Sequence, residues 1–220
     1  MSIFSSLSYK SRKRKLELFY EKFNPAENTQ ILDIGAEVNI DGDRGLQLID
    51  SYRWKGKLSA LNISESHIEH VKKNYPMIDA VVGDACKLPW PDKHFDVVYS
   101  NAVIEHVGDY NRQKQMAKEI IRVAKNWFVT TPNKRYPFEF HLRLPFVTWL
   151  PGNTYLKVGN IISYNHVKKK YTLGNKCEGL RLLTPKEFSA CFPSSNMIKQ
   201  QITFMPETLV AIGGEVFTKK

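Results

Sequence analysis

Residues 83–107 read GDACKLPWPDKHFDVVYSNAVIEHV, and the segment FDVVY (95–99) inside them has the apolar, β-branched composition of a buried parallel strand. A turn-rich segment with two prolines precedes this strand, and a polar segment follows it. Strands of this kind belong to α/β sheets, in which ligands bind beyond the carboxyl ends of the strands. The stretch therefore predicts a fold class and also indicates where functional residues should lie.

Similar apolar runs recur on both sides of this strand, at 31–35, 58–61, 78–82 and 127–130. Segments with the apolar spacing of helices lie before and between them, at 16–23, 46–49, 63–74 and 112–124. Two late strands are expected at 198–204 and 208–212. This alternation predicts one α/β domain with a Rossmann-like, doubly wound, mostly parallel sheet, preceded by a basic N-terminal helix within residues 1–27.

The pattern changes after the fifth strand. Residues 133–183 are rich in Pro, Tyr, Phe and Lys and show no clean period. Long segments with little regular structure inside a compact domain are usually functional, so we expect a lid over the substrate here. Regular structure should resume at Thr184-Pro185-Lys186-Glu187, which has the pattern of a helix capping box.

The overall composition restricts the class of protein. The 220 residues are 42% hydrophobic, which is enough for a sizeable core, and no apolar run is long enough to span a membrane. The three cysteines, Cys86, Cys177 and Cys191, are far apart, so we expect a reduced compartment and no structural zinc. The first fifteen residues also reverse the charge order of a signal peptide. A cytoplasmic protein is the expectation.

The net charge is +10, from 32 basic and 22 acidic residues. Basic residues concentrate at 10–15 and at 168–170. Either these are solvated faces, or they bind an anionic partner such as RNA, a phosphorylated substrate or the inner face of a membrane. Signatures of common RNA-binding modules are absent, and stable DNA binding is not expected.

Polar and small residues follow the predicted strands, as a nucleoside ligand would need. Asp33 and Gly35 follow the first strand, Asp84 follows the third, and Asn101 follows the fourth. A carboxylate there accepts hydrogen bonds from the ligand, and a glycine lets the backbone approach it.

The strings ILDIGA (31–36), residues 83–107 and EIIRVAKNWFVTTPN (119–133) together resemble class I S-adenosylmethionine-dependent methyltransferases of the type-11-like group. The resemblance implies a seven-stranded sheet, methyltransferase activity and S-adenosylmethionine as cofactor. It assigns cofactor binding to Asp33, Gly35, Ala36, Glu37, Asn62, Ile63, Asp84, Ala85, Cys86 and Asn101.

The chain departs from the family pattern at two places. The first loop keeps only Gly35 of its usual glycines and introduces Glu37 and Asn39. Asn62 replaces the carboxylate that usually binds the ribose, which exchanges a charge-assisted hydrogen bond for a neutral one, a loss of about 1 kcal/mol. A non-catalytic binding or scaffold protein therefore stays open as an alternative.

Glu105 and His106 follow the fourth strand. Some relatives bind a divalent metal through Glu-x-x-Glu-His, but here Ala102 replaces the first Glu, so no metal is expected. Two interpretations remain: the pair supports its own helix, or His106 takes a proton from the substrate.

The predicted lid begins with YPFEFHLRLPF (136–146). Glu139 and His141 would share one face of an extended segment, where they would form either a general base with its orienting carboxylate or a surface ion pair. The apolar residues at 146–150 are expected to be buried under the lid rather than to touch a membrane.

Taken together, the residues and the resemblance predict a methyltransferase that acts on an oxygen or nitrogen of a small molecule or glycan. His141, His106 and Glu139 are the candidate catalytic residues. An RNA methyltransferase using the basic clusters is the alternative enzyme.

Overall fold

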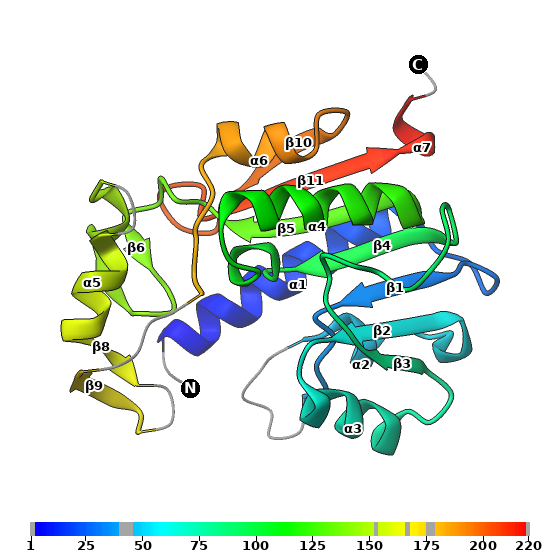
Figure 1. The fold of residues 1–220 in the computed structure, drawn as a ribbon, viewed down its shortest axis with the longest axis horizontal. Coiled ribbons are helices and arrows are strands. Elements are labelled where there is room, and N and C mark those ends of the chain that lie inside the picture. The colour runs from blue at the N-terminus through cyan, green and yellow to red at the C-terminus, as the bar shows by residue number, and fades with distance from the viewer. Residues whose placement is uncertain (1–2, 40–45, 152–153, 166–167, 175–178, 219–220) are drawn as a thin grey trace.

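In the computed structural model, a seven-stranded sheet lies between two layers of helices, and a smaller group of short elements lies beyond the carboxyl ends of its parallel strands (Figure 1). The structure describes residues 3–39, 46–151, 154–165, 168–174 and 179–218. The strands of the sheet are β1 (Ile31–Ile34), β2 (Leu58–Asn62), β3 (Asp79–Val82), β4 (Phe95–Asn101), β5 (Ala124–Pro132), β10 (Asn196–Gln200) and β11 (Thr208–Gly214).

The strand order is β10-β11-β5-β4-β1-β2-β3. All neighbouring pairs are parallel except those made by β11, which runs antiparallel to both β5 and β10. The chain winds outward in one direction from β1 through β2 to β3 and in the other direction from β4. This reversal creates a topological switch point between β1 and β4, where open α/β sheets bind ligands. The predicted fold class is confirmed.

The helices are α1 (Ile3–Phe23), α2 (Leu48–Ser51), α3 (Glu65–Asn74), α4 (Tyr110–Val123), α5 (Thr154–Ile161), α6 (Pro185–Cys191) and α7 (Glu215–Thr218), with single 3₁₀ turns η1 (Lys55–Lys57), η2 (Ile104–His106) and η3 (Val147–Trp149). α4 and α6 pack on one face of the sheet, and α1, α2 and α3 pack on the other. Successive strand residues alternate between the two cores, as the pleat of a strand requires. Leu32, for example, lies in the α4 core and Ile31 in the α1 core.

The N-terminal helix α1 is an integral part of the domain. Its Phe19 is fully buried and contacts the rings of Tyr99 and Phe128, which stack on each other with centroids 5.5 Å apart. The carboxyl-terminal half of α1 thereby covers the centre of the sheet. Its N-terminal half extends past the carboxyl ends of the parallel strands toward the lid (Figure 1).

Several predicted boundaries shift. β5 begins at Ala124, three residues before the apolar run that predicts it, and β10 ends at Gln200, so residues 201–204 are not a strand. The capping box at Thr184 and Glu187 is confirmed, with the Thr184 hydroxyl accepting from the Glu187 N–H and the Glu187 carboxylate accepting from the Thr184 N–H.

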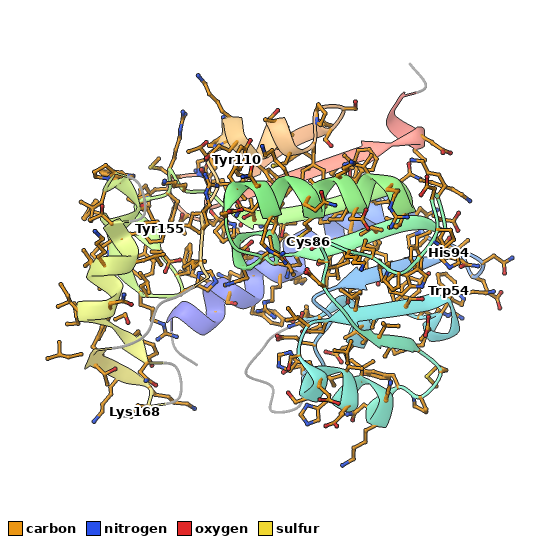
Figure 2. The ribbon with its side chains drawn as sticks, viewed as in Figure 1. Trp54, Cys86, His94, Tyr110, Tyr155 and Lys168 are labelled. Atoms are coloured by element: carbon orange, nitrogen blue, oxygen red, sulfur yellow. The ribbon has the colours of Figure 1, made fainter. Side chains whose placement is uncertain are left out.

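The expectation of little regular structure at 133–183 is wrong. This segment contains two small hairpins, β6 (Phe138–Glu139) with β7 (Leu144–Pro145) and β8 (Ile162–Asn165) with β9 (Lys170–Leu173), as well as η3 and α5. It also has its own small hydrophobic core around Tyr155, labelled in Figure 2. These elements are two to eight residues long, too short for apolar periodicity to reveal them.

The apolar residues at 146–150 do not share one environment. Val147 is buried, but Phe146 and Trp149 are exposed, so the expectation that this group is buried under the lid is wrong for those two aromatic residues. Phe146 also has a positive φ of 61°, and its ring contacts that of Trp149, with centroids 5.3 Å apart.

None of the helices in the described residues is long and apolar enough to cross a membrane.

Candidate functional site

A cavity of about 750 Å³ opens at the carboxyl ends of the parallel strands, a volume within the usual range for small-molecule sites. Four parts of the chain enclose it: the ends of β1, β2 and β4, the N-terminal half of α1, the lid, and the end of β5 with the segment that leads into β11. Of the predicted site residues, those that line it are Gly35, Glu37, Asn62, Ile63, Asn101, His106 and His141. The strand ends, His106 on η2 and His141 of the lid thus face one continuous space.

Gly35 forms the turn that opens the cavity at the end of β1. Its φ is +81°, in the left-handed region that favours glycine, and a Cβ there would collide with the Val103 side chain. Its N–H donates to the Leu61 carbonyl at 2.7 Å, so the turn is held against β2. Only glycine satisfies both the conformation and the close packing.

Asn62 connects the loops after β1 and β2. Its amide Nδ2 donates to the Ala36 carbonyl at 3.0 Å, and its Oδ1 accepts from the Ser64 N–H at 2.9 Å. The side chain is almost completely buried while still lining the cavity. Asn62 therefore shapes the pocket and keeps one further lone pair on Oδ1 for a ligand.

Two acidic residues predicted in the first loop have different environments. Glu37 lines the cavity and lies 3.3 Å from His67 Nδ1. Asp33 is buried behind the loop, where burial and the nearby carboxylates of Asp50 and Glu37 raise its pKa to about 8. Asp33 does not line the cavity, and its carboxyl accepts a hydrogen bond from the Ile49 backbone.

Asp84, Ala85 and Cys86 do not line the cavity, and Ala85 and Cys86 are buried in the α4 core. Asp84 accepts from the Cys86 N–H at 2.9 Å and from the Arg112 guanidinium at 2.7 Å. Burial favours its neutral form, but these bonds outweigh that effect and the pKa of Asp84 is lowered. Its carboxylate already has partners in this structure.

Asn101 lies at the end of β4, and its Oδ1 accepts from the Thr130 hydroxyl at 2.9 Å. The next residue, Ala102, has a φ of +57°, unusual for a residue with a side chain. This left-handed turn directs the chain away from the sheet and into η2, which carries Glu105 and His106.

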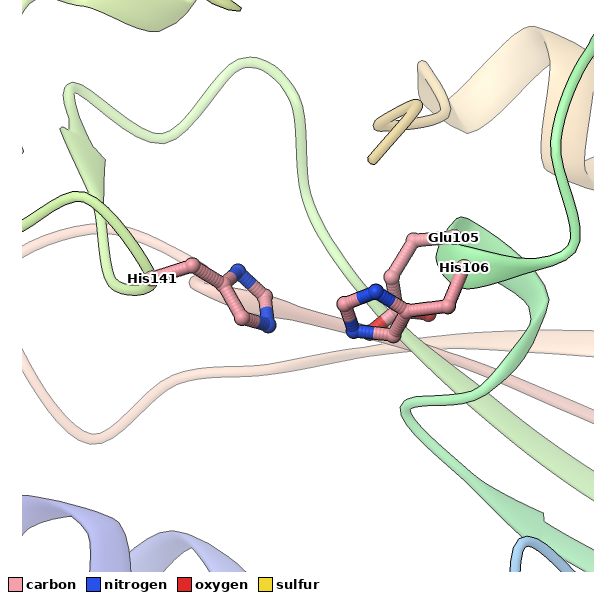
Figure 3. A group of neighbouring side chains, drawn as sticks. All are labelled: Glu105, His106 and His141. Carbon is pink, nitrogen blue, oxygen red and sulfur yellow. The ribbon is translucent and has the colours of Figure 1, made fainter. Parts of the chain in front are cut away.

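The rings of His106 and His141 meet edge to face in the cavity, with centroids 4.9 Å apart, although they lie 35 positions apart in the sequence (Figure 3). Glu105 projects from the same turn as His106, and ligand atoms of all three residues lie within 4.8 Å of one another. His141 Nδ1 lies 2.7 Å from Glu139 Oε1, so the predicted contact between Glu139 and His141 is present.

Burial and neighbouring charges shift the pKa values of Glu105, His106 and His141 in different directions. Burial lowers the pKa of His106 to about 4 and the neighbouring His141 contributes, while burial raises the pKa of Glu105 to about 7. Burial acts to lower the pKa of His141 as well, but the hydrogen bond and charge of Glu139 outweigh it and the net pKa is raised. At neutral pH, therefore, His106 is a neutral imidazole beside a more basic one.

A buried network holds η2 in place. The Arg181 N–H donates to the Glu105 carbonyl at 2.8 Å, and Gln113 donates to the carbonyls of Ile104 and Arg181. Thr131 on β5 donates its hydroxyl to Glu105 Oε2 at 3.1 Å. The cluster is therefore supported both by the sheet and by the C-terminal end of the lid segment.

Helix α1 also contributes to the site, although its residues are not among the predicted site residues. Lys15 lines the cavity although only 7% of it is exposed, and burial followed by the charge of Arg12 lowers its pKa to about 8. Ser8, Ser11 and Lys15 follow helical spacing and share one helix face, a pattern that was available in the sequence but lay within a basic run. Glu207, at the start of β11, faces Lys15 from the sheet.

Comparisons with known proteins agree with this architecture. A family model described as a methyltransferase domain matches residues 43–127. A probable S-adenosylmethionine-dependent methyltransferase of Mycolicibacterium smegmatis is 36% identical over 81 residues, which cover 36% of this chain and 30% of that protein. The matched part thus spans less than a third of that relative's own length.

Two solved structures share the fold over nearly the whole chain. The PH0226 protein of Pyrococcus horikoshii has a TM-score of 0.60 at 18% identity, with 96% of this chain and 92% of that one covered. An S-adenosylmethionine-dependent methyltransferase of Clostridium acetobutylicum has a TM-score of 0.59 at 9% identity, with 93% and 90% covered. At these identities, the likeness concerns the fold.

Proposed function

We propose that this chain, which carries a class I S-adenosylmethionine-dependent methyltransferase domain, transfers a methyl group from S-adenosylmethionine to an oxygen or nitrogen of a small-molecule or glycan acceptor. The observation that carries the proposal is the single cavity that joins the strand ends at the switch point to the histidines under the lid. A donor bound at one end and an acceptor at the other would meet inside it.

The residues at the strand ends fit the cofactor. The turn at Gly35 presents backbone to the cavity, Asn62 keeps an acceptor lone pair, and Asn101 lies at the switch point. Asp33 and Ala36 support this loop from behind, and Ile63, 76% exposed, offers an apolar surface at the rim. When bound, S-adenosylmethionine supplies an activated methyl group.

The chain's own contribution is to position the two reactants and to exclude water. Such alignment alone accounts for a large part of the rate in group transfer. His141 and His106 project from opposite sides of the cavity toward the acceptor's place, and Glu139 fixes the ring of His141. Their imidazoles are placed to withdraw the proton that the acceptor loses.

Calorimetric titration with S-adenosylmethionine and S-adenosylhomocysteine tests the proposal. We expect micromolar binding of both, weakened by at least about tenfold in Asn62→Ala, because that change removes the contacts that shape the donor end. Lys72→Ala, on the exposed side of α3, is the matched control and should bind as the unaltered chain does. Absence of binding to either compound in a folded sample would remove the proposal and favour a scaffold role.

An RNA methyltransferase is the second candidate function, because the basic residues do not form one surface. In the N-terminal cluster, Arg12 and Lys15 face the cavity, Lys13 lies 3.8 Å from Glu17, and Arg14 donates to the Gln201 carbonyl. These side chains point in different directions rather than forming one surface. RNA binding whose affinity falls steeply with salt, accompanied by methylation of RNA, would reverse this ranking.

A further inference from the structure

We propose that Glu105, His106 and His141 form a binding site for a divalent transition-metal ion at the acceptor end of the cavity. Their ligand atoms lie within 4.8 Å of one another, and the three residues come from two separate elements, η2 and the turn after β6 (Figure 3). The loss of a glutamate at Ala102, which makes the sequence pattern incomplete, is offset by His141, which only the fold brings to the place.

Glu105 provides an independent indication of a ligand. Its side chain is fully buried, and Oε1 has no hydrogen-bond partner among the described residues, while Oε2 is held by the Thr131 hydroxyl. A buried carboxylate oxygen without a partner costs about 1–3 kcal/mol or more, so proteins rarely retain one without use. A bound cation would supply the missing partner.

The surroundings of His141 match those of a metal-ligating histidine. Glu139 Oε1 binds Nδ1 of the ring, and the other Glu139 oxygen accepts the Leu142 N–H. A carboxylate that holds one ring nitrogen fixes the tautomer and leaves Nε2 as the nitrogen available to an ion. Glu139 is thus a positioning residue, buried to the same degree as Glu105.

The donor set selects the type of ion. Two imidazoles and one carboxylate suit Zn²⁺, Fe²⁺, Co²⁺ or Mn²⁺, whereas Mg²⁺ and Ca²⁺ prefer all-oxygen sites. Lys15 and Glu207, which also face this region, carry opposite charges. Three protein ligands leave coordination positions open toward the cavity, as in catalytic rather than structural sites.

The open position suggests a role, which rests on the proposed function: a metal ion there would bind the acceptor hydroxyl and lower its pKa, so that its proton passes to solvent water. The oxygen would then attack the methyl carbon, forming a C–O bond as the S–C bond breaks and S-adenosylhomocysteine leaves. In that case both imidazoles are occupied as ligands. Without the metal, an imidazole would take the proton itself. Metal binding distinguishes the two modes.

Metal binding is measured on the full chain, freed of metal with a chelator, by titration with Co²⁺, whose visible absorption changes when nitrogen and carboxylate ligands replace water. We expect one Co²⁺ per chain, displaced by Zn²⁺ and not by Mg²⁺. Glu105→Gln and His141→Ala should weaken binding by at least about tenfold, and Glu139→Gln by about 10–100-fold. His70→Ala, an exposed histidine on α3, is the matched control and should not change it.

Two outcomes would overturn the site: no saturable Co²⁺ binding, or binding that Glu105→Gln and His141→Ala leave unchanged while thermal unfolding shows that both variants are folded. Glu105→Gln keeps the size of the side chain, which guards against loss of folding. S-adenosylhomocysteine titrations on the same samples separate the two proposals. Metal binding without cofactor binding removes methyl transfer and keeps the metal site, and the reverse result removes only the metal site.

Discussion

A single amide, that of Asn62, takes the place of the carboxylate expected at the end of β2. A carboxylate could not make the same contacts, because Nδ2 donates to the Ala36 carbonyl and a carboxylate has no hydrogen to donate. The substitution is therefore matched to the altered loop after β1, which approaches closely enough to need a donor. One hydrogen bond thus joins Asn62 to the loop after β1, the two places where the sequence departs from the methyltransferases that it resembles.

The bond between Asn62 and the Ala36 carbonyl predicts the effect of Asn62→Asp. Although the change introduces the carboxylate that the resembled methyltransferases have at this place, it puts an acceptor against the Ala36 carbonyl, so we expect a loss of about 1–3 kcal/mol in the free energy of unfolding. Affinity for S-adenosylhomocysteine should not increase. Urea unfolding and calorimetry at pH 7 measure both quantities, and a variant that is as stable as the unaltered chain and binds more tightly would contradict this prediction.

Asp33 predicts a dependence of stability on pH. Its folded pKa is raised to about 8, whereas an aspartate in the unfolded chain titrates near about 3.9. Between these values the folded state holds a proton that the unfolded state has released, so the stability contributed by this group falls as the pH rises, by up to about 1.4 kcal/mol per pH unit.

Asp33→Asn removes this titration while preserving an acceptor for the Ile49 N–H. We expect the variant's free energy of unfolding to increase relative to that of the unaltered chain as the pH is raised from 5 to 8. Urea unfolding at each pH unit gives the difference directly. A difference that stays constant over this range would show that Asp33 is ionised in the folded state.

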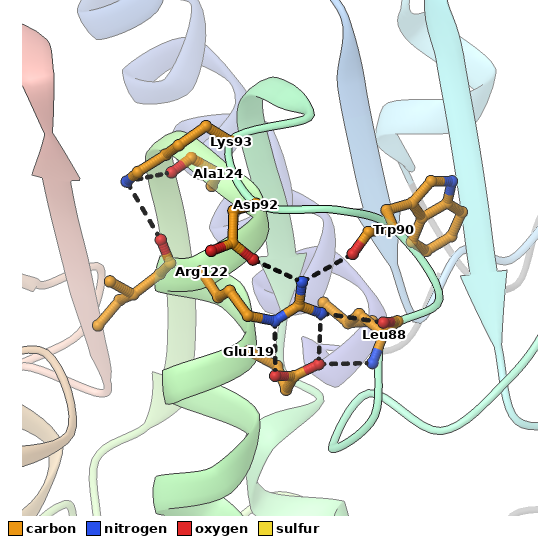
Figure 4. A network of polar contacts seen from close by, with 8 residues as sticks. Leu88, Trp90, Asp92, Lys93, Glu119, Arg122 and Ala124 are labelled. Atoms are coloured by element: carbon orange, nitrogen blue, oxygen red, sulfur yellow. Dashed lines mark hydrogen bonds and ion pairs between the residues drawn. The ribbon is translucent and has the colours of Figure 1, made fainter.

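At the scale of elements, Arg122 of α4 makes several hydrogen bonds to the proline-containing turn at residues 88–92, which leads into β4 (Figure 4). Arg122 donates two bonds to Glu119, at 2.9 and 2.8 Å, and it also reaches the carbonyls of Leu88 and Trp90 and the carboxylate of Asp92. The planar guanidinium is the side chain that can make such a set of bonds at once. The two prolines of the turn leave it few N–H groups of its own for this purpose.

Arg122→Ala should lower the free energy of unfolding by about 2–4 kcal/mol, because it breaks charge-assisted bonds and leaves a largely buried Glu119 without its main partner. Arg122→Lys keeps the charge but not the fork, and should recover only part of the loss. Lys118→Ala, an exposed change on the same helix, is the control in chemical denaturation. Equal stability of all three variants would show that the turn is stable without the hydrogen bonds of Arg122.

The elements also show what the sequence can predict. Strands such as β1 and β4 are buried on both faces, so continuous apolar runs reveal them, and the capping box of α6 is a local pattern that needs no tertiary information. That Lys15 faces the cavity depends instead on how α1 passes the carboxyl ends of the strands. The meeting of His106 with His141 depends on the path of the lid, which local sequence does not determine.

The whole molecule has two unequal parts that the site joins. The sheet is covered on both faces, whereas the lid has only a small core of Leu142, Val147, Tyr155, Leu180 and Leu182. Because local stability follows buried apolar surface, we expect the lid to open with less free energy than the sheet. A lid that opens easily would admit the acceptor and release the product.

Tyr155 is the residue through which this expectation can be tested. Its hydroxyl donates to the Leu180 carbonyl at 2.9 Å and accepts from the Leu182 N–H at 3.2 Å, all within a buried core. Tyr155→Phe leaves both backbone groups without this partner, and we expect a loss of about 1–3 kcal/mol that falls on the lid. Native-state hydrogen exchange should show faster exchange at α5 and β8 and unchanged protection of β4 and β5.

Tyr171→Phe, which removes an exposed hydroxyl bonded to the Arg143 carbonyl, is the matched control and should alter exchange much less. If Tyr155→Phe instead lowered protection equally in the lid and in the central strands, the two parts would unfold as one unit, and the acceptor could enter only through the opening that the folded cavity already has.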